Sequence, residues 1–267
     1  MSNLLNGCWA KLDRAEECLQ NLNAEFVSFI DRDPKPFDIV GKHNGAEYQF
    51  IVRGDPILPP RFSVLIGEIV HHLRSTLDHL VWALVIRNSR SPDWKNQFPI
   101  CITKEKFEDA CRKGMLKGIS DGATKIIQEL QPFNNATPRD TIFYVLHEYD
   151  IVDKHRLLLV TATVAQLGQE IEVAVNQNKP TDIGPPMKTP STIAFGAAGP
   201  WSIKNDGDIL WTVGFGEPAP QVEIKVKFNS FLAFEKCGLV PLQPVLPTLE
   251  NFCIATRNAV EALKGEF

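Results

Sequence analysis

The sequence predicts an α+β protein in which helices and strands occupy separate parts of the chain. Two long amphipathic segments lie in the N-terminal half, short β-branched segments follow, and one amphipathic segment closes the chain. Apolar residues recur at three- and four-residue steps in the first and last regions, which indicates helices, whereas alternation in the middle region indicates strands. The order of helices, then strands, then one helix is typical of segregated layers.

The first amphipathic segment runs from Leu4 to about Ile30 and is predicted to be a helix. A β-hairpin is predicted next, between about residues 37 and 53. Tyr48, Phe50 and Val52 occupy alternate positions there, and Asn44-Gly45 is a turn signal.

The longest predicted helix runs from Phe62 to Asn88 and follows the helix breaker Pro59-Pro60. One side of this helix is apolar and should face the core. The other side carries a polar stripe with large apolar neighbours: Glu68, His72, Ser75 and His79, flanked by Val64, Trp82, Ala83 and Ile86. Because an apolar surface of this kind is rare on a free monomer, we expect another part of the chain or a second copy to cover it.

The remaining elements follow from helix start signals and from alternation. Thr137-Pro138-Arg139-Asp140 predicts the start of a helix that ends at the segment DKHR (Asp153 to Arg156). Shorter helices are predicted over 104–113 and 122–130, strands over 157–165, 170–175, 192–195, 209–215 and 221–228, and a closing helix capped by Thr248. We therefore expect a helical region over 1–157 that includes the hairpin, a β-rich segment over 158–240, and a C-terminal helix over 245–267 that packs on the helical region.

Composition and charge narrow the classes of function. Apolar residues make up 44% of the chain and charged residues 22%, as in ordinary globular proteins, and the net charge of −4 does not support broad electrostatic binding to nucleic acid. The six Cys show no Cys-x-x-Cys spacing, which favours reduced thiols over a disulfide framework or a zinc site. The N-terminus has no signal-peptide pattern, and the longest helix contains several charged residues, so we expect a cytoplasmic protein that does not enter a membrane.

The segment Arg74-Ser75-Thr76-Leu77-Asp78-His79 is the first candidate for catalysis. Imidazole titrates near neutral pH and can transfer a proton, and guanidinium presents a planar fork to phosphoryl oxygens. On an ideal helix the two side chains point about 140° apart, so they could meet at one phosphate only in a cleft between helices.

An Arg followed by His after four residues on a helix resembles the signature of the HEPN superfamily of ribonucleases. The resemblance implies an HEPN-like helical bundle, with the β-sheet segment inserted before the last helix. It also implies metal-independent RNA cleavage at a homodimer interface and a role as a toxin or defence effector. His79 would then handle the 2′-hydroxyl proton, and Arg74 would stabilise the phosphorane-like transition state.

A broader likeness supports the same region of the chain. The segments HHLRSTLDHLVWAL and LHEYDIVDKHRLLLV resemble a group of uncharacterised bacterial proteins with "LRSALDHL" and "DKHR" segments. Residues near the two motifs are therefore candidates for supporting the site or binding RNA: His72, Ser75, Asp78, Lys154, His155 and Arg156. The RNA substrate and a regulatory partner such as an antitoxin are implied by the resemblance alone.

Other interpretations of these residues remain open. Arg74 and Asp78 stand one helical turn apart and could form only an intrahelical ion pair, and the cations of DKHR could serve a helix C-terminus. The same helix face could be a non-catalytic interaction or dimerisation surface. Glu68 and His71 have the Glu-x-x-His spacing of di-iron bundles, but no second Glu-x-x-His exists in the chain. We predict no bound metal and no cofactor.

Overall fold

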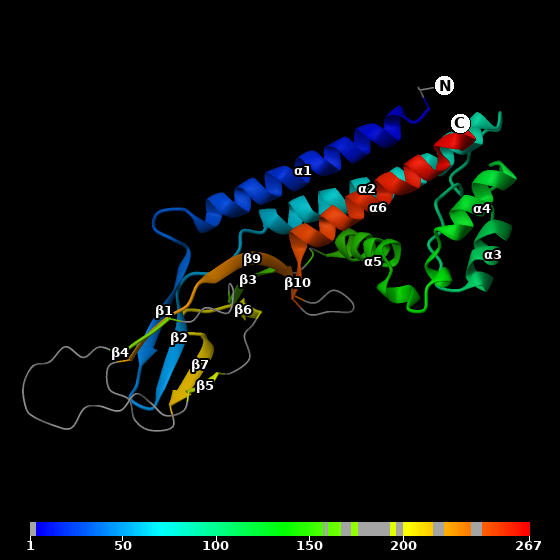
Figure 1. The fold of residues 1–267 in the computed structure, drawn as a ribbon. Coiled ribbons are helices and arrows are strands. Elements are labelled where there is room, and N and C mark those ends of the chain that lie inside the picture. The colour runs from blue at the N-terminus through cyan, green and yellow to red at the C-terminus, as the bar shows by residue number, and fades with distance from the viewer. Residues whose placement is uncertain are drawn as a thin grey trace, which may run out of the picture. The chain divides into compact units, whose positions relative to one another are not determined.

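The chain forms a mixed α+β structure with antiparallel sheets, described here by a computed structural model (Figure 1). The structure describes residues 4–156, 158, 160–166, 172–175, 193–195, 200–215, 222–235 and 242–267. It divides into two compact units. The helical unit comprises Met1–Glu25, Pro60–Leu159 and Lys236–Phe267, and the β unit comprises Phe26–Pro59 and Val160–Glu235.

The helical unit is built around α2 (Arg61–Arg87). The other helices are α1 (Asn6–Ile30, whose last turn is counted with the β unit), α3 (Lys104–Arg112), α4 (Asp121–Glu129), α5 (Ile142–His155) and α6 (Val245–Leu263). Helix α2 contacts α5 and α6, and α5 also contacts α6. Helix α1 lies along α2 and α6: the Cys8 thiol reaches the Thr76 carbonyl oxygen, and Arg257 on α6 forms an ion pair with Glu16.

The apolar side of α2 forms the core of this unit, as its 3.6-residue period predicts. Every predicted core residue on this side is 3% exposed or less: Phe62, Ile66, Ile69, Val70, Leu73, Leu77, Leu80, Val81 and Leu84. Each such side chain contributes roughly 1.5–3 kcal/mol by leaving water. Within the described part of the chain, no helix is both long enough and apolar enough to cross a bilayer.

Two helix starts differ from the prediction. Thr137 precedes a short 3₁₀ turn (Pro138–Asp140) and makes no capping bond, so α5 begins later, at Ile142. Helix α6 begins three residues before Thr248, whose hydroxyl donates to the carbonyl oxygen of Pro244. Both Thr residues read as N-caps in the sequence, but Thr137 makes no capping bond and the Thr248 hydroxyl bonds a carbonyl oxygen instead. Pro138 follows the first Thr and Pro247 precedes the second, and each Pro has a backbone angle that suits a helical turn.

The β unit contains two larger antiparallel sheets and one strand pair. The first sheet has the strand order β1 (Phe37–His43), β2 (Glu47–Gly54), β7 (Ile209–Phe215), β5 (Ile193–Phe195). In the second sheet β3 (Val160–Gln166) pairs with both β9 (Phe228–Phe234) and β6 (Trp201–Ile203). Strands β4 (Glu172–Val175) and β8 (Val222–Lys225) form the separate pair, and the short β10 spans Gln243–Pro244.

The hairpin of β1 and β2 belongs to the β unit, although the sequence prediction grouped it with the helical region. It turns at Asn44-Gly45, with Gly45 at a φ of 85°, as the turn signal predicts. Its position differs because β2 pairs with β7, a strand far along the chain. The segment predicted as one strand over 221–228 also differs: it divides into β8 and the start of β9, which pair with different strands.

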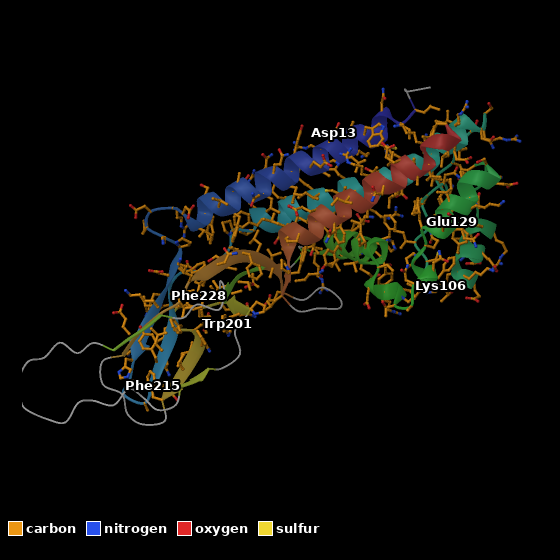
Figure 2. The ribbon with its side chains drawn as sticks, in the orientation of Figure 1. Asp13, Lys106, Glu129, Trp201, Phe215 and Phe228 are labelled. Atoms are coloured by element: carbon orange, nitrogen blue, oxygen red, sulfur yellow. The ribbon has the colours of Figure 1, made fainter. Side chains whose placement is uncertain are left out.

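One buried apolar cluster joins the sheets of the β unit. It includes Phe50 and Trp211 from the first sheet, whose rings stack with centroids 5.4 Å apart, Val164 from the second sheet, and Ile224 from β8. Partly buried aromatic side chains lie against this cluster, among them the labelled Trp201, Phe215 and Phe228 (Figure 2).

Candidate functional site: the exposed stripe of helix α2

Arg74, the predicted phosphate-binding residue, is enclosed by the fold. Its side chain is 8% exposed, and its guanidinium donates to Asp78 Oδ1 at 2.8 Å and to the carbonyl oxygen of Phe98 at 2.9 Å. The same oxygen of Asp78 accepts the backbone N–H of Phe98 at 2.9 Å. Arg74 and Asp78 together therefore hold the segment that begins at Phe98.

A buried Gln holds the same segment from its other side. Gln131 is 1% exposed; its amide donates to the carbonyl oxygens of Pro99 and Ile127, and its oxygen accepts the N–H of Cys101. These bonds satisfy backbone groups that would otherwise be buried without partners. The segment Phe98–Cys101 is thus fixed between α2 and the end of α4, which gives Arg74 a structural role.

His79, the predicted proton-transfer residue, lies on a different side of α2. Its side chain is exposed, and a Cβ added to Gly7 of α1 would come within 3.7 Å of its Nδ1. Partial burial and the nearby Lys11 ammonium lower the pKa of His79, while Asp78 opposes this change. The structure does not bring Arg74 and His79 together within one chain.

The exposed side of α2 is a row of seven residues that we call the α2 stripe: Val64, Glu68, His71, Ser75, His79, Trp82 and Ile86. Val64, Trp82 and Ile86 are 45%, 44% and 40% exposed, although they are large apolar side chains. Helix α1 lies along one side of the stripe, where the Cys18 thiol reaches Glu68 at 3.8 Å. The chain's own elements therefore leave the apolar members of the stripe open to solvent.

Two residues that the sequence predicted on this side, the stripe member His72 and its neighbour Ala83, are less exposed than the stripe. Ala83 is buried, and His72 is half-buried. The Nδ1 atom of His72 is buried and has no hydrogen bond to a described residue. Burial lowers the pKa of His72, and the charges of Lys11, His71 and Arg14 lower it further, against the effect of Glu68. The neutral imidazole is therefore the favoured form at this position.

A cleft of about 330 Å³ lies beside the stripe, lined by Val64, Gly67, Glu68, His71, His72 and Asp153. On the α5 side of this region, His71 Nδ1 lies 3.5 Å from Oδ1 of Asp150, a carboxylate that is 2% exposed. The other oxygen of Asp150 accepts from Lys154 Nζ at 2.5 Å. This contact lacks hydrogen-bond geometry, but it turns the Nδ1 edge of the His71 ring towards α5 and leaves the other ring nitrogen outside the contact.

Asp153 fits against α2 because residue 67 has no side chain. A Cβ added to Gly67 would collide with the Asp153 carboxylate. Burial raises the pKa of Asp153, the Asp150 charge raises it further, and His71 opposes this change. Glycine in the middle of a helix costs roughly 1 kcal/mol relative to alanine, so its presence here reflects this close approach.

The remaining predicted residues take varied positions. Lys154 pairs with Asp150, whereas His155 and Arg156 are exposed at the end of α5. Ser75 is half-buried, and its hydroxyl makes no hydrogen bond to a described residue. Among the residues that the structure describes, no group of three or more His, Cys, Asp or Glu side chains is arranged to hold a metal ion, so Glu68 and His71 do not form part of such a group.

Asp150 and Gly67 were missed as members of this site by the sequence analysis. Asp150 stands four residues before Lys154 on α5, so their ion pair could have been predicted from the i, i+4 spacing. The contact of Asp150 with His71 could not have been predicted from the sequence, because it depends on how α2 and α5 pack. Comparison of the chain with protein families, curated proteins and solved structures gives no match.

Proposed function

We propose that the protein is an interaction module that forms a homodimer through the α2 stripe. The observation that carries this proposal is the spacing of the stripe, which reads the same in both directions from Ser75. Its members lie at positions 64, 68, 71, 75, 79, 82 and 86, with steps of four, three, four, four, three and four residues. A surface that forms a two-fold symmetric interface packs against its own copy, and this spacing would place each member of the row opposite another member.

Antiparallel packing about Ser75 pairs compatible side chains. Val64 would lie opposite Ile86 of the second copy, so that two exposed aliphatic side chains cover each other. Trp82 would lie opposite Glu68, whose carboxylate can accept the indole N–H. A small residue at the centre allows two helices to approach closely, and Ser75 supplies it.

Side-chain chemistry favours a protein partner over RNA at this surface. The carboxyl groups of Glu68, Asp150 and Asp153 are balanced by the nearby cations of Lys154, Lys11 and Arg14. The region therefore lacks the net positive charge on which nucleic-acid binding depends. Exposed tryptophan, by contrast, is enriched among the residues that dominate protein interfaces.

Sedimentation equilibrium of the wild type beside two Trp variants tests the proposal. We expect the wild type to be a dimer and Trp82→Glu to dissociate at least about 100-fold more readily, because each interface loses two aromatic contacts and gains carboxylates opposite Glu68. Trp94→Glu is the matched control, because Trp94 is 79% exposed and outside the stripe. A monomeric wild type, or equal dissociation of the two variants, would refute the proposal.

Metal-independent RNA cleavage within an HEPN-like bundle is a second candidate function, favoured by one observation. His71 is oriented by buried Asp150 with its side chain 58% exposed, and antiparallel packing would place it opposite His79 of the second copy. Two imidazoles can act as general base and general acid without a metal. Arg74 is bound within the fold, so the phosphate would have to be stabilised by another cation.

Incubation of RNA with the protein in EDTA tests this second candidate. If it holds, His71→Ala and His79→Ala should each lower the cleavage rate by about 10²- to 10⁴-fold, with products that end in 2′,3′-cyclic phosphate. The exposed His155 provides a control, and His155→Ala should retain activity. Absence of cleavage by the wild-type dimer would leave only the interaction function.

A further inference from the structure

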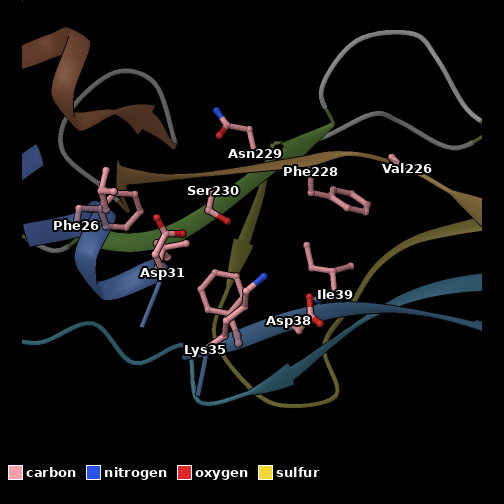
Figure 3. A pocket seen from close by; sticks show the side chains of 12 residues that line it. Phe26, Asp31, Lys35, Asp38, Ile39, Val226, Phe228, Asn229 and Ser230 are labelled. Atoms are coloured by element: carbon pink, nitrogen blue, oxygen red, sulfur yellow. Dashed lines mark hydrogen bonds between the residues drawn. The ribbon is translucent and has the colours of Figure 1, made fainter. Parts of the chain in front are cut away.

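The β unit contains a pocket that is separate from the α2 stripe. It has a volume of about 440 Å³ and lies between the end of α1, strand β1 and strand β9 (Figure 3). Its apolar walls are formed by Phe26, Ile30, Phe37, Ile39, Val226 and Phe228. A volume of this size is within the usual range for small-molecule sites, roughly 300–1,000 Å³.

At this pocket, part of the core of the β unit reaches solvent. Ile30, Ile39, Val226 and Phe228 pack against the buried cluster of this unit but are themselves only partly buried. Phe37, which also lines the pocket, and the cluster residues behind it are 7% exposed or less. A ligand that covers these side chains would remove apolar surface from water, which favours binding.

Three charged residues surround the opening, and two of them are acidic. Asp31 and Asp38 lie on either side of Lys35 in Figure 3, and all three are exposed. None of them forms an ion pair with a described residue. Other exposed charges of the same unit do form ion pairs, as in Arg53 with Asp206 at 3.4 Å. The opening therefore has a net charge of −1. The Asp31 carboxylate has no hydrogen bond to a described residue, and Asp38 accepts the backbone N–H of Ile39 through Oδ1 at 2.9 Å, which leaves Oδ2 for a ligand.

We propose that this pocket binds a small amphiphilic amine, a ligand with an aromatic or large aliphatic body and one ammonium group. The carboxylates of Asp31 and Asp38 attract the cation. The faces of Phe37 and Phe228 can add cation–π attraction while the rings cover the apolar body. Lys35 has a long flexible stem, so its ammonium can move away from the bound cation and remain in water.

Calorimetric titration of the full chain with three ligands of matched size tests the proposal. The probes are phenethylamine, 2-phenylethanol and 3-phenylpropionate, which carry a positive, a neutral and a negative head on similar bodies. We expect the amine to bind at least tenfold more tightly than the carboxylate, with the alcohol between them. Equal or tighter binding of the carboxylate, or no binding of the amine at millimolar concentration, would overturn the proposal.

Substitutions of the charged residues at the opening test whether the amine binds in this pocket. Asp31→Asn combined with Asp38→Asn should weaken phenethylamine binding by about tenfold, and Lys35→Met should strengthen it. Glu223→Gln is the control, because Glu223 is an exposed acid of the same unit that does not line the pocket. Equal binding by the double variant and this control would refute the location. Trp82→Glu should bind the amine as the wild type does, so failure of the dimer proposal and failure of this one are distinguishable.

Discussion

At the scale of single residues, Arg74 shows why a motif and a site can differ. The sequence places Arg74 and His79 at a spacing that resembles a nuclease signature, and the same sequence permits an ion pair between Arg74 and Asp78. The structure has the ion pair, with the guanidinium also bonded to the Phe98 carbonyl oxygen. A buried guanidinium with these partners contributes to the stability of the fold.

Substitution of Arg74 should therefore lower the free energy of unfolding. We expect Arg74→Ala to cost about 3–5 kcal/mol, because it leaves the Asp78 carboxylate and a backbone carbonyl without their cation. His79→Ala, at an exposed position, should cost within about 0.5 kcal/mol. Urea denaturation measures both. Equal stability of the two variants would contradict the structural role of Arg74.

Two half-buried histidines predict how stability depends on pH. Burial lowers the pKa of His72 and of His147 below the ordinary value of 6.5, and their buried Nδ1 atoms lack a partner among the described residues. The unfolded chain then binds more protons than the folded chain below pH 6.5. The free energy of unfolding should therefore fall as pH decreases from about 6.5 through the lowered pKa values.

Thermal unfolding between pH 7.5 and 5.5 measures this dependence. His147→Gln should reduce it, because the substituted side chain cannot be protonated in this range. His155→Gln is the control, since His155 is exposed, and it should leave the dependence unchanged. Stability that is constant over this range in the wild type would show that these histidines do not titrate as the structure indicates.

At the scale of elements, the contact of α2 with α5 depends on one glycine. Alanine is favoured over glycine in a helix interior by roughly 1 kcal/mol, but at position 67 its methyl group would displace Asp153. We expect Gly67→Ala to give no gain in the wild-type background and a gain of about 1 kcal/mol in an Asp153→Ala background. A double-mutant cycle measured by urea denaturation gives this coupling, and additivity of the two substitutions would exclude the contact.

Local sequence patterns predicted which helices and strands form more accurately than they predicted where these elements begin and end. All nine residues that the 3.6-residue period assigned to the buried side of α2 are buried, since burial of one face determines that pattern. Leu65, Ala83 and Val85 are buried as well, because other elements cover more of the helix than one face. The strand predicted over 221–228 was divided in the structure, because alternation is the same whether one strand continues or two strands join different sheets. Thr137 read as a helix cap because a 3₁₀ turn begins with the same residues as an α-helix.

At the scale of the whole molecule, long-range contacts determine two features that local sequence patterns could not predict. The hairpin joins the β unit through the pairing of β2 with β7, and His71 meets Asp150 through the packing of α2 on α5. Neither contact has a signature in local spacing. Most of the α2 stripe, by contrast, follows from one helix, so Glu68, Ser75, His79 and the exposed Val64, Trp82 and Ile86 could be identified from periodicity alone. The prediction placed His72 in the stripe, where the structure has His71.

The dimer proposal also predicts how the two α2 helices run. In an antiparallel pair Ser75 faces its own copy, whereas the two Val64 residues lie about 33 Å apart along the helix axis. Engineered cysteines can report this arrangement in a chain whose Cys111 and Cys237 are replaced by serine. Burial raises the pKa of Cys8 and of Cys253 to about 11 and also raises the pKa of Cys18 and of Cys101, so these thiols are protonated at pH 8.

Disulfide cross-linking at these positions, followed by non-reducing electrophoresis and intact mass, tests the dimer most directly. Ser75→Cys alone should cross-link two chains on mild oxidation. Val64→Cys alone and Ile86→Cys alone should not, whereas a mixture of these two variants should give a cross-link between them. A cross-link formed by Val64→Cys alone would indicate parallel helices, and absence of any cross-link through Ser75→Cys would contradict assembly through the α2 stripe.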